Sequence, residues 1–202
     1  VGSEMCIRDR VERAGMTVDA LLDMKRCDPE TKWRSLSHND RETFGKACIL
    51  RAPIPRNDLP PTRTGVIPTD YNGMTQIPRE TADLFLSKAD RGSLRRWHSW
   101  AADYWLDKGE RSERLFHLIK SGRNLEANWL AMRMKADILF SPSDDLLESL
   151  SMIRPERGLE RNMAWLCAEA AIGCRDLKKA REMAEKLRRL ESPEHMTVMS
   201  QI

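Results

Sequence analysis

Residues 124–140 read NLEANWLAMRMKADILF and carry two apolar stripes on one predicted helix. One stripe consists of Leu125, Trp129, Met132, Ala136 and Leu139, and the other of Ala127, Leu130, Met134 and Ile138. A helix that is apolar on two sides is expected to pack against neighbours on both. The stretch therefore predicts a helix in the middle of a stack.

Helical periodicity extends over the chain on both sides of this stretch. It predicts further helices over residues 93–108, 112–120, 144–153, 155–172 and 176–191. Gly109 and Gly122 are expected to end two of them, Ser143 to cap a third, and Pro155 to begin a fourth. Connections this short force neighbouring helices to run antiparallel, so we expect a mostly α fold with an α-solenoid of three hairpins.

The chain before residue 79 has a different character. We expect a helix over residues 17–26, capped by Thr17, and a second over 37–50, capped by Ser37. Residues 53–78 hold six of the ten prolines and are predicted to form a loop, with at most a short hairpin around Asn72-Gly73. Pro78 suits the start of a helix over residues 79–87.

The composition narrows the class of protein. The 202 residues are 41% hydrophobic and 32% charged, with a net charge of +3, which argues against a dedicated nucleic-acid binder. No apolar run reaches the length of a membrane-spanning helix, so no membrane partner is expected.

The five cysteines form no CxxC pair, and Cys167 and Cys174 lie about two helical turns apart. Reduced thiols and a cytoplasmic location are the expectation.

The first ten residues, VGSEMCIRDR, resemble the conceptual translation of a sequencing adaptor, a string that recurs at the ends of environmental gene models. We therefore exclude them from the fold and expect that natural sequence upstream is missing.

The predicted organisation is a winged-helix-like module with its proline-rich linker at 11–78, a helical repeat domain at 79–192 and a tail at 193–202.

The last predicted hairpin resembles a tetratricopeptide repeat. Residues 175–187 read RDLKKAREMAEKL, which is similar to the turn and second helix of that repeat, with Asp176 and Ala180 in register. Arg175 stands where the repeat has a turn glycine, and Ala168 takes the place of its small residue. The resemblance implies a protein-binding repeat.

A larger part of the chain, roughly residues 36–131, resembles signal-transduction ATPases with numerous domains. The segments that carry the likeness are SLRRWHSWAADYWLDKG (93–109), RLFHLIKSG (114–122) and NLEA (124–127), with LSHNDRE (36–42) and ACILRAPIP (47–55) upstream. The likeness implies a degenerate winged-helix module whose later helix is shortened to 56–59. It also implies an ATPase domain upstream in a longer protein.

Sequence motifs of catalysis are absent. The sequence contains no G-x-x-x-x-G-K-[ST] phosphate loop and no GxGxxG, GxSxG or HExxH motif. We expect no enzymatic activity, no cofactor and no metal. His98 and His117 are interpreted as packing residues, and Asp144 and Asp145 as the start of a helix.

The predicted function is protein–protein interaction, as the regulatory arm of a larger signalling ATPase. Trp97, Trp100, Trp105 and Trp129 are expected to pack in the core, with Trp100 at a groove edge. The candidate partner-binding residues are Trp100, Arg123, Asn128 and Lys135. The alternative is a DNA-binding regulator, which requires a contiguous basic strip beside residues 40–80, whereas the first hypothesis predicts mixed charge there.

Overall fold

The chain is mostly helical. A computed structural model describes residues 33–62 and 67–190, so the predicted helix at 17–26, the first ten residues and the tail at 193–202 lie outside the described residues. Two compact units are present, Val1–Ala101 and Ala102–Ile202, and their boundary falls within one helix. Over the described ranges, no helix has both the length and the hydropathy that a bilayer crossing requires.

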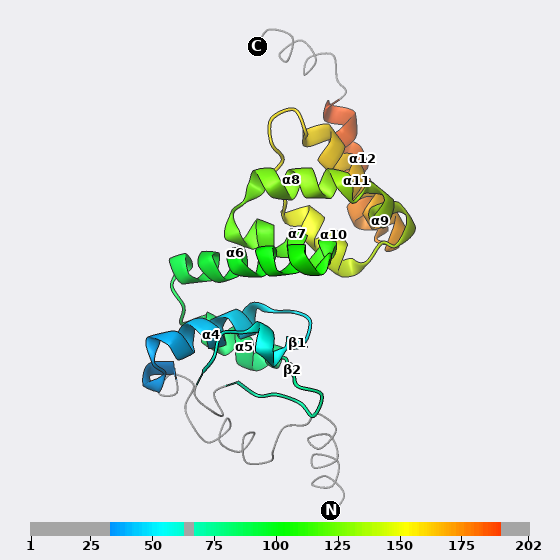
Figure 1. Ribbon diagram of the computed structural model, residues 1–202. Helices are drawn as coiled ribbons and strands as arrows, with labels where there is room; N and C mark the ends of the chain where they lie inside the picture. Colours follow the sequence, from blue (N-terminus) through cyan, green and yellow to red (C-terminus); the bar gives the residue numbers. More distant parts are fainter. Residues whose placement is uncertain (1–32, 63–66, 191–202) are drawn as a thin grey trace, which may run out of the picture. The chain divides into compact units, whose positions relative to one another are not determined.

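The first unit combines helices with a two-stranded antiparallel ribbon (Figure 1). Its elements are α4 (His38–Ile49), β1 (Ile54–Pro55), a 3-10 turn at Arg56–Asp58, β2 (Met74–Thr75), α5 (Arg79–Leu86) and the first part of α6 (Arg91–Lys108). Ile54 pairs with Thr75. The chain turns at Asn72-Gly73, where the Gly73 amide donates to the Asp70 carbonyl. The prediction of a hairpin around this turn is wrong, because β2 pairs with β1, whose residues lie far upstream in sequence.

Local sequence explains how α4 starts. The Ser37 hydroxyl accepts a hydrogen bond from the Asp40 amide at 3.2 Å and donates to the Asp40 carboxylate at 2.7 Å, so the predicted cap is confirmed. Phe44 of α4 meets Phe85 of α5 edge to face, with ring centroids 4.8 Å apart. Gly45 lies against the Trp97 ring, which leaves no room for a Cβ atom.

The second unit contains the rest of α6 and the later helices. They are α7 (Arg111–Ser121), α8 (Asn124–Arg133), α9 (Lys135–Phe140), α10 (Asp144–Met152), α11 (Glu160–Gly173) and α12 (Leu177–Leu190). Gly109 and Gly122 adopt φ values of 76° and 85°, which non-glycine residues rarely do, and they end α6 and α7 as the sequence predicts. Ser143 caps α10 through the Leu146 amide, as predicted.

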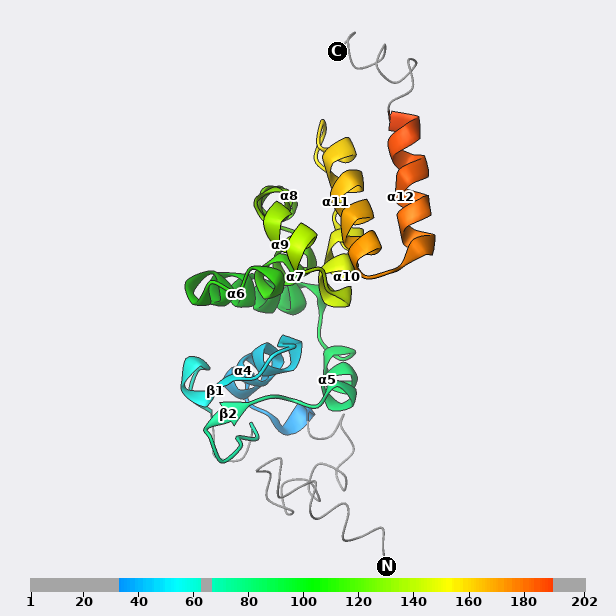
Figure 2. The same cartoon turned by 90° about the vertical axis from the view of Figure 1, so that its right-hand side faces the viewer.

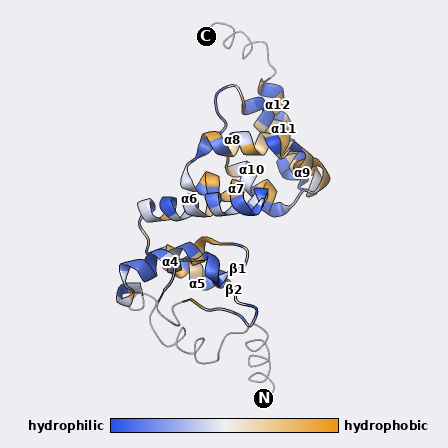
Figure 3. Cartoon of the chain, viewed as in Figure 1, coloured by the Kyte–Doolittle hydropathy of each residue, from blue (hydrophilic) through white to orange (hydrophobic). Residues whose placement is uncertain are grey.

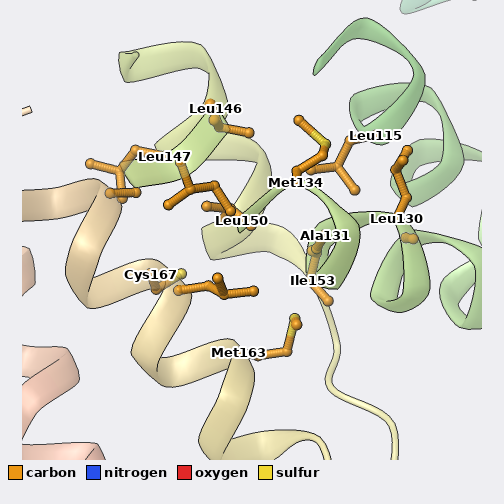
Figure 4. Packing of buried hydrophobic residues seen from close by; sticks show 14 of the residues in the cluster. Leu115, Leu130, Ala131, Met134, Leu146, Leu147, Leu150, Ile153, Met163 and Cys167 are labelled. Carbon is orange, nitrogen blue, oxygen red and sulfur yellow. The ribbon is translucent and has the colours of Figure 1, made fainter. Parts of the chain in front are cut away.

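The helices of this unit share one hydrophobic core. α7 packs against α8 and α10, while α11 packs against α8, α9, α10 and α12. Figure 2 shows α11 and α12 side by side as a hairpin. In the core, Leu115, Met134 and Leu166 are almost inaccessible to solvent, and Figure 4 shows Met134 facing Leu115 and Leu130. Contacts between elements distant in sequence therefore hold the unit together.

The structure divides the predicted helix over 124–140 at Met134. This residue has ψ near 12°, and its amide donates to both the Leu130 and the Ala131 carbonyl oxygens. Such a bifurcated bond tightens the turn and ends α8, after which α9 begins at Lys135. The prediction of one continuous helix is therefore wrong at Met134, which is itself fully buried.

The prediction that Pro155 begins a helix is also wrong. Asn128, which is fully buried, donates to the Arg154 carbonyl at 3.0 Å and accepts from the Glu156 amide at 3.2 Å. These bonds fix the segment around Pro155 as a connection. Gly158 then turns the chain at φ 86°, and α11 begins at Glu160.

The two units do not divide at residue 78, where the proline-rich segment ends. α5 packs against α4, and the indole Nε1 of Trp97 in α6 donates to the Glu42 carboxylate at 2.7 Å. These contacts join α5 and the first part of α6 to the first unit. The proline content of a loop carries no information about such contacts.

Candidate functional site

The candidate site is an apolar surface on α8 and α9. Leu125, Trp129, Leu139 and Phe140 are exposed by 58%, 58%, 39% and 84%. We call these four residues the α8–α9 stripe. Ala136 is also exposed between them, and Met132 is half-buried. Figure 3 shows hydrophobic and hydrophilic segments next to one another along these helices.

The opposite side of the same two helices builds the core. Ala127, Leu130, Met134 and Ile138 have at most 8% of their surface exposed. The prediction that both apolar sides of residues 124–140 are packed is therefore wrong, because only one side meets neighbouring helices. Trp97 and Trp105 are buried as predicted, with 2% and 6% exposure, but Trp129 is not.

Two cationic side chains border the stripe. Arg133 and Lys135 are both exposed, Arg133 at the end of α8 and Lys135 at the start of α9. The Lys135 Nζ lies 4.8 Å from the centroid of the Trp165 ring in α11, within the range of a cation–π interaction. Lys135 therefore links the stripe to the half-buried Trp165 on the neighbouring helix.

The carboxylates nearest the stripe are held by arginines. Arg123 binds Glu126 through two hydrogen bonds, at 2.6 and 2.7 Å, and Asp103 through a third at 2.6 Å. Asp137 lies 3.4 Å from Arg111. The hydrogen bonds from Arg123 hold the pKa of the Glu126 carboxyl below its usual range and raise the pKa of Arg123.

The four residues predicted to bind a partner have different surroundings. Trp100 is half-buried, with the Lys46 Nζ 5.2 Å from its ring centroid. Arg123 is occupied by Asp103 and Glu126, as described, and Lys135 borders the stripe. Asn128 is fully buried and holds the connection before α11, so its side chain is not part of the surface.

The sequence analysis does not predict the stripe as a binding surface. It places Leu125, Trp129 and Leu139 in one apolar row and predicts that this row packs against a neighbour. Phe140, which directly precedes the break at residues 141–143, belongs to neither predicted row. The only available signal was the second apolar side itself, which periodicity cannot assign to core or surface.

Histidines and cysteines are the remaining candidates for reactive or metal-binding groups. No group of three or more His, Cys, Asp or Glu side chains able to hold a metal occurs within residues 33–62 and 67–190. His117 is fully buried beside Phe116. Cys48, Cys167 and Cys174 are free thiols, and burial raises the pKa of the Cys48 thiol. A raised pKa favours the unreactive thiol form.

Charges beside residues 40–80 are mixed. Arg41 donates to the backbone carbonyls of Leu36 and Arg34, and Arg56 to those of Leu59 and Pro60. Glu42 forms an ion pair with Arg96 at 3.1 Å. Arg41 and Arg56 therefore hold the chain's own backbone.

Comparisons of the chain with protein-family models, with curated proteins and with solved structures gave no match.

Proposed function

We propose that this chain is a non-catalytic protein-interaction module whose binding surface is the α8–α9 stripe. The observation that carries the proposal is the exposure of Leu125 and Trp129 on α8 and of Leu139 and Phe140 on α9, two consecutive helices. Contiguous large apolar side chains on a soluble surface are typical of interaction sites. Trp and Phe are also frequent anchors of protein interfaces.

The arrangement of the helices supports this proposal. The stripe lies on helices whose other side is firmly packed, with Ala127, Met134 and Ile138 fully buried. A surface on packed helices needs little ordering when a partner binds, which favours affinity. The antiparallel α11–α12 pair and the resemblance of residues 175–187 to a tetratricopeptide repeat favour a solenoid of hairpins as the framework.

The resemblance of residues 36–131 extends the proposal to a biological context. We infer that the module serves as the regulatory arm of a signalling ATPase whose nucleotide-binding domain belongs to the longer protein. The mixed charge beside residues 40–80 favours this protein-binding role over the alternative of DNA binding, which requires a contiguous basic strip.

A selection of peptides tests the interaction surface. The whole chain is presented to a displayed library of random peptides of about 18 residues, a helix long enough to cover the stripe. We expect enriched peptides to lose about tenfold or more in affinity for a Trp129→Ala, Phe140→Ala double variant. They should retain affinity for a Lys186→Ala variant, which changes an exposed residue of α12.

Two outcomes contradict the proposal. One is a selection that enriches no peptide. The other is enriched peptides whose affinity is the same for the double variant and for the wild type. Circular dichroism of each variant verifies that the helices are intact.

A further inference from the structure

We propose that the junction between α8 and α9 is a hinge, at which residues 124–140 convert between the bent form described above and one continuous helix. Three observations support the hinge: the break has no local cause in the sequence, contacts from other helices hold α9 in place, and straightening joins an apolar row that the break divides. The regulatory meaning of the hinge rests on the proposed function, whereas its existence does not.

The break at Met134 has no local cause in the sequence. Residues 131–137 read AMRMKAD, which contains neither glycine nor proline, and Ala, Met, Arg and Lys are among the strongest helix formers. Within the described ranges, however, the amides of residues 135–137 donate to no backbone carbonyl. A continuous helix would supply the carbonyls of residues 131–133 as their acceptors. A single 3-10 turn inside a helical stretch, such as the Met134 amide makes with the Ala131 carbonyl, often marks a hinge.

Contacts with α7 and α11 hold α9 in the bent form. The Lys135 Nζ lies over the Trp165 ring of α11, and the Asp137 carboxylate lies 3.4 Å from the Arg111 guanidinium of α7. Ile138 is fully buried, and α9 packs against α11. The ion pair is largely exposed, and exposed pairs contribute little to stability. Removing the ion pair and the cation–π contact should therefore shift the hinge without unfolding the chain.

The break divides an apolar row that a straight helix would join. The five residues of the row are spaced alternately by four and three positions, which places them along one side of a continuous helix. Three of them belong to α8 and two to α9: Leu125, Trp129, Met132, Ala136 and Leu139.

Straightening is compatible with the core of the second unit. Met134 and Ile138 follow Leu130 at intervals of four residues, so a continuous helix keeps all three on the side of α8 that faces the core. The change rearranges folded helices and orders no loose chain. A partner that binds the joined row better than the divided one would therefore select the continuous helix.

Residue-resolved hydrogen exchange of the whole chain tests the hinge without a ligand. An Arg111→Ala, Lys135→Ala double variant removes both exposed contacts of α9. We expect the amides of residues 135–137 to exchange at least about twofold more slowly in this variant than in the wild type, because more molecules contain the continuous helix. An Arg181→Ala, Lys186→Ala double variant changes two exposed residues of α12 and should leave these rates unchanged.

Proline blocks one of the two forms selectively. Ala136 is exposed in the first turn of α9, where a proline is tolerated, but in a continuous helix it would clash with the preceding turn. Adding Ala136→Pro to the Arg111→Ala, Lys135→Ala variant should restore rapid exchange at residues 135 and 137. Two results overturn the hinge: unchanged exchange at residues 135–137 in the double variant, or faster exchange at residues 138–140, which would mean that α9 unravels.

The library peptides that bind the stripe test the regulatory meaning. We expect them to slow exchange at residues 135–137 and to bind Ala136→Pro about tenfold less tightly than the matched control Ala136→Ser. Equal affinity for the two variants would overturn selection of the continuous helix by the partner and leave the proposed function intact. If no peptide is enriched, the proposed function fails, and the exchange rates of the ligand-free variants still decide whether the hinge exists.

Discussion

Arg175 adopts a backbone conformation that ordinarily favours glycine. Its φ is 61°, the one positive value of a non-glycine residue within the described ranges. The turn between α11 and α12 requires it, because the Asp176 amide donates to the Ala171 carbonyl and the Arg175 amide to that of Ile172. These bonds satisfy the last carbonyls of α11, in the manner of a Schellman cap.

We therefore expect Arg175→Gly to raise the free energy of unfolding by about 0.5–1 kcal/mol, because glycine enters the left-handed region without a Cβ penalty. Arg175→Ala is the matched control and should give no such gain. Chemical denaturation measures both. A glycine variant no more stable than the alanine variant would show that the turn is relaxed in another way.

Asn128 stabilises the second unit from within. Asn128→Leu keeps the branched shape of the side chain but leaves the Arg154 carbonyl and the Glu156 amide without their bonds to it. We expect a loss of about 2–3 kcal/mol in the free energy of unfolding. Asn162→Leu, at an exposed position of α11, should change it by less than about 0.5 kcal/mol. Equal effects would contradict the structural role of Asn128.

Trp97 and Trp129 are expected to contribute very differently to the stability of the fold. Trp97 is 2% exposed and Trp129 is 58% exposed. Trp97→Ala is expected to cost about 3–5 kcal/mol of folding stability, whereas Trp129→Ala should cost less than about 0.5 kcal/mol. Thermal unfolding of the two variants checks this difference. A large loss for Trp129→Ala would mean that Trp129 supports the fold.

At the scale of elements, Arg123 joins α6 to α8 through Asp103 and Glu126. Because Glu126 has a lowered pKa in the folded state, its contribution to stability is complete above the unfolded value of about 4.3. That contribution is lost as pH falls through the lower folded value. The arginine therefore contributes at neutral pH and little in strong acid.

Arg123→Met should reduce the free energy of unfolding by about 1 kcal/mol at neutral pH, since the pair is partly exposed. The deficit should shrink as pH falls below about 4. Urea denaturation at a series of pH values measures it. A deficit that stays constant down to strong acid would mean that the lost contribution comes from packing of the arginine stem.

Sequence reasoning predicted those element ends that depend on local chemistry. Ser37, Ser143 and Gly122 cap their helices through bonds within a few residues, so their spacing is sufficient. At Pro155 it is wrong, because bonds from the distant Asn128 decide the backbone there. It is also wrong at Met134, whose bifurcated bond to Leu130 and Ala131 leaves no mark in the apolar spacing. Periodicity does not predict the exposure of the stripe, because it shows that a side is apolar but not whether a neighbour covers it.

At the scale of the whole molecule, the two units have separate cores. In the described ranges, the hydrophobic cluster that contains Met134 starts at Ala102 and extends to Met183. Phe44, Phe85 and Trp97 build the first unit instead. Gly45 is essential there, because any side chain at this position would overlap the Trp97 ring.

Gly45→Ala is therefore expected to destabilise the first unit by about 1–3 kcal/mol. Hydrogen exchange should accelerate in α4 and α5 and stay unchanged in α10, α11 and α12. Leu150→Ala, in the core of the second unit, should produce the converse pattern. Acceleration throughout the chain in both variants would show that the units unfold as one.

Because Trp129 is exposed, its intrinsic fluorescence can report on binding at the stripe. Of the tryptophans that the structure describes, it alone is more than half exposed, so its indole emits from an aqueous environment and is open to soluble quenchers such as acrylamide. Any molecule that covers the ring should shift that emission to shorter wavelength and shield it from quenching. Occupancy of the surface is thus readable from intrinsic fluorescence, without an attached dye.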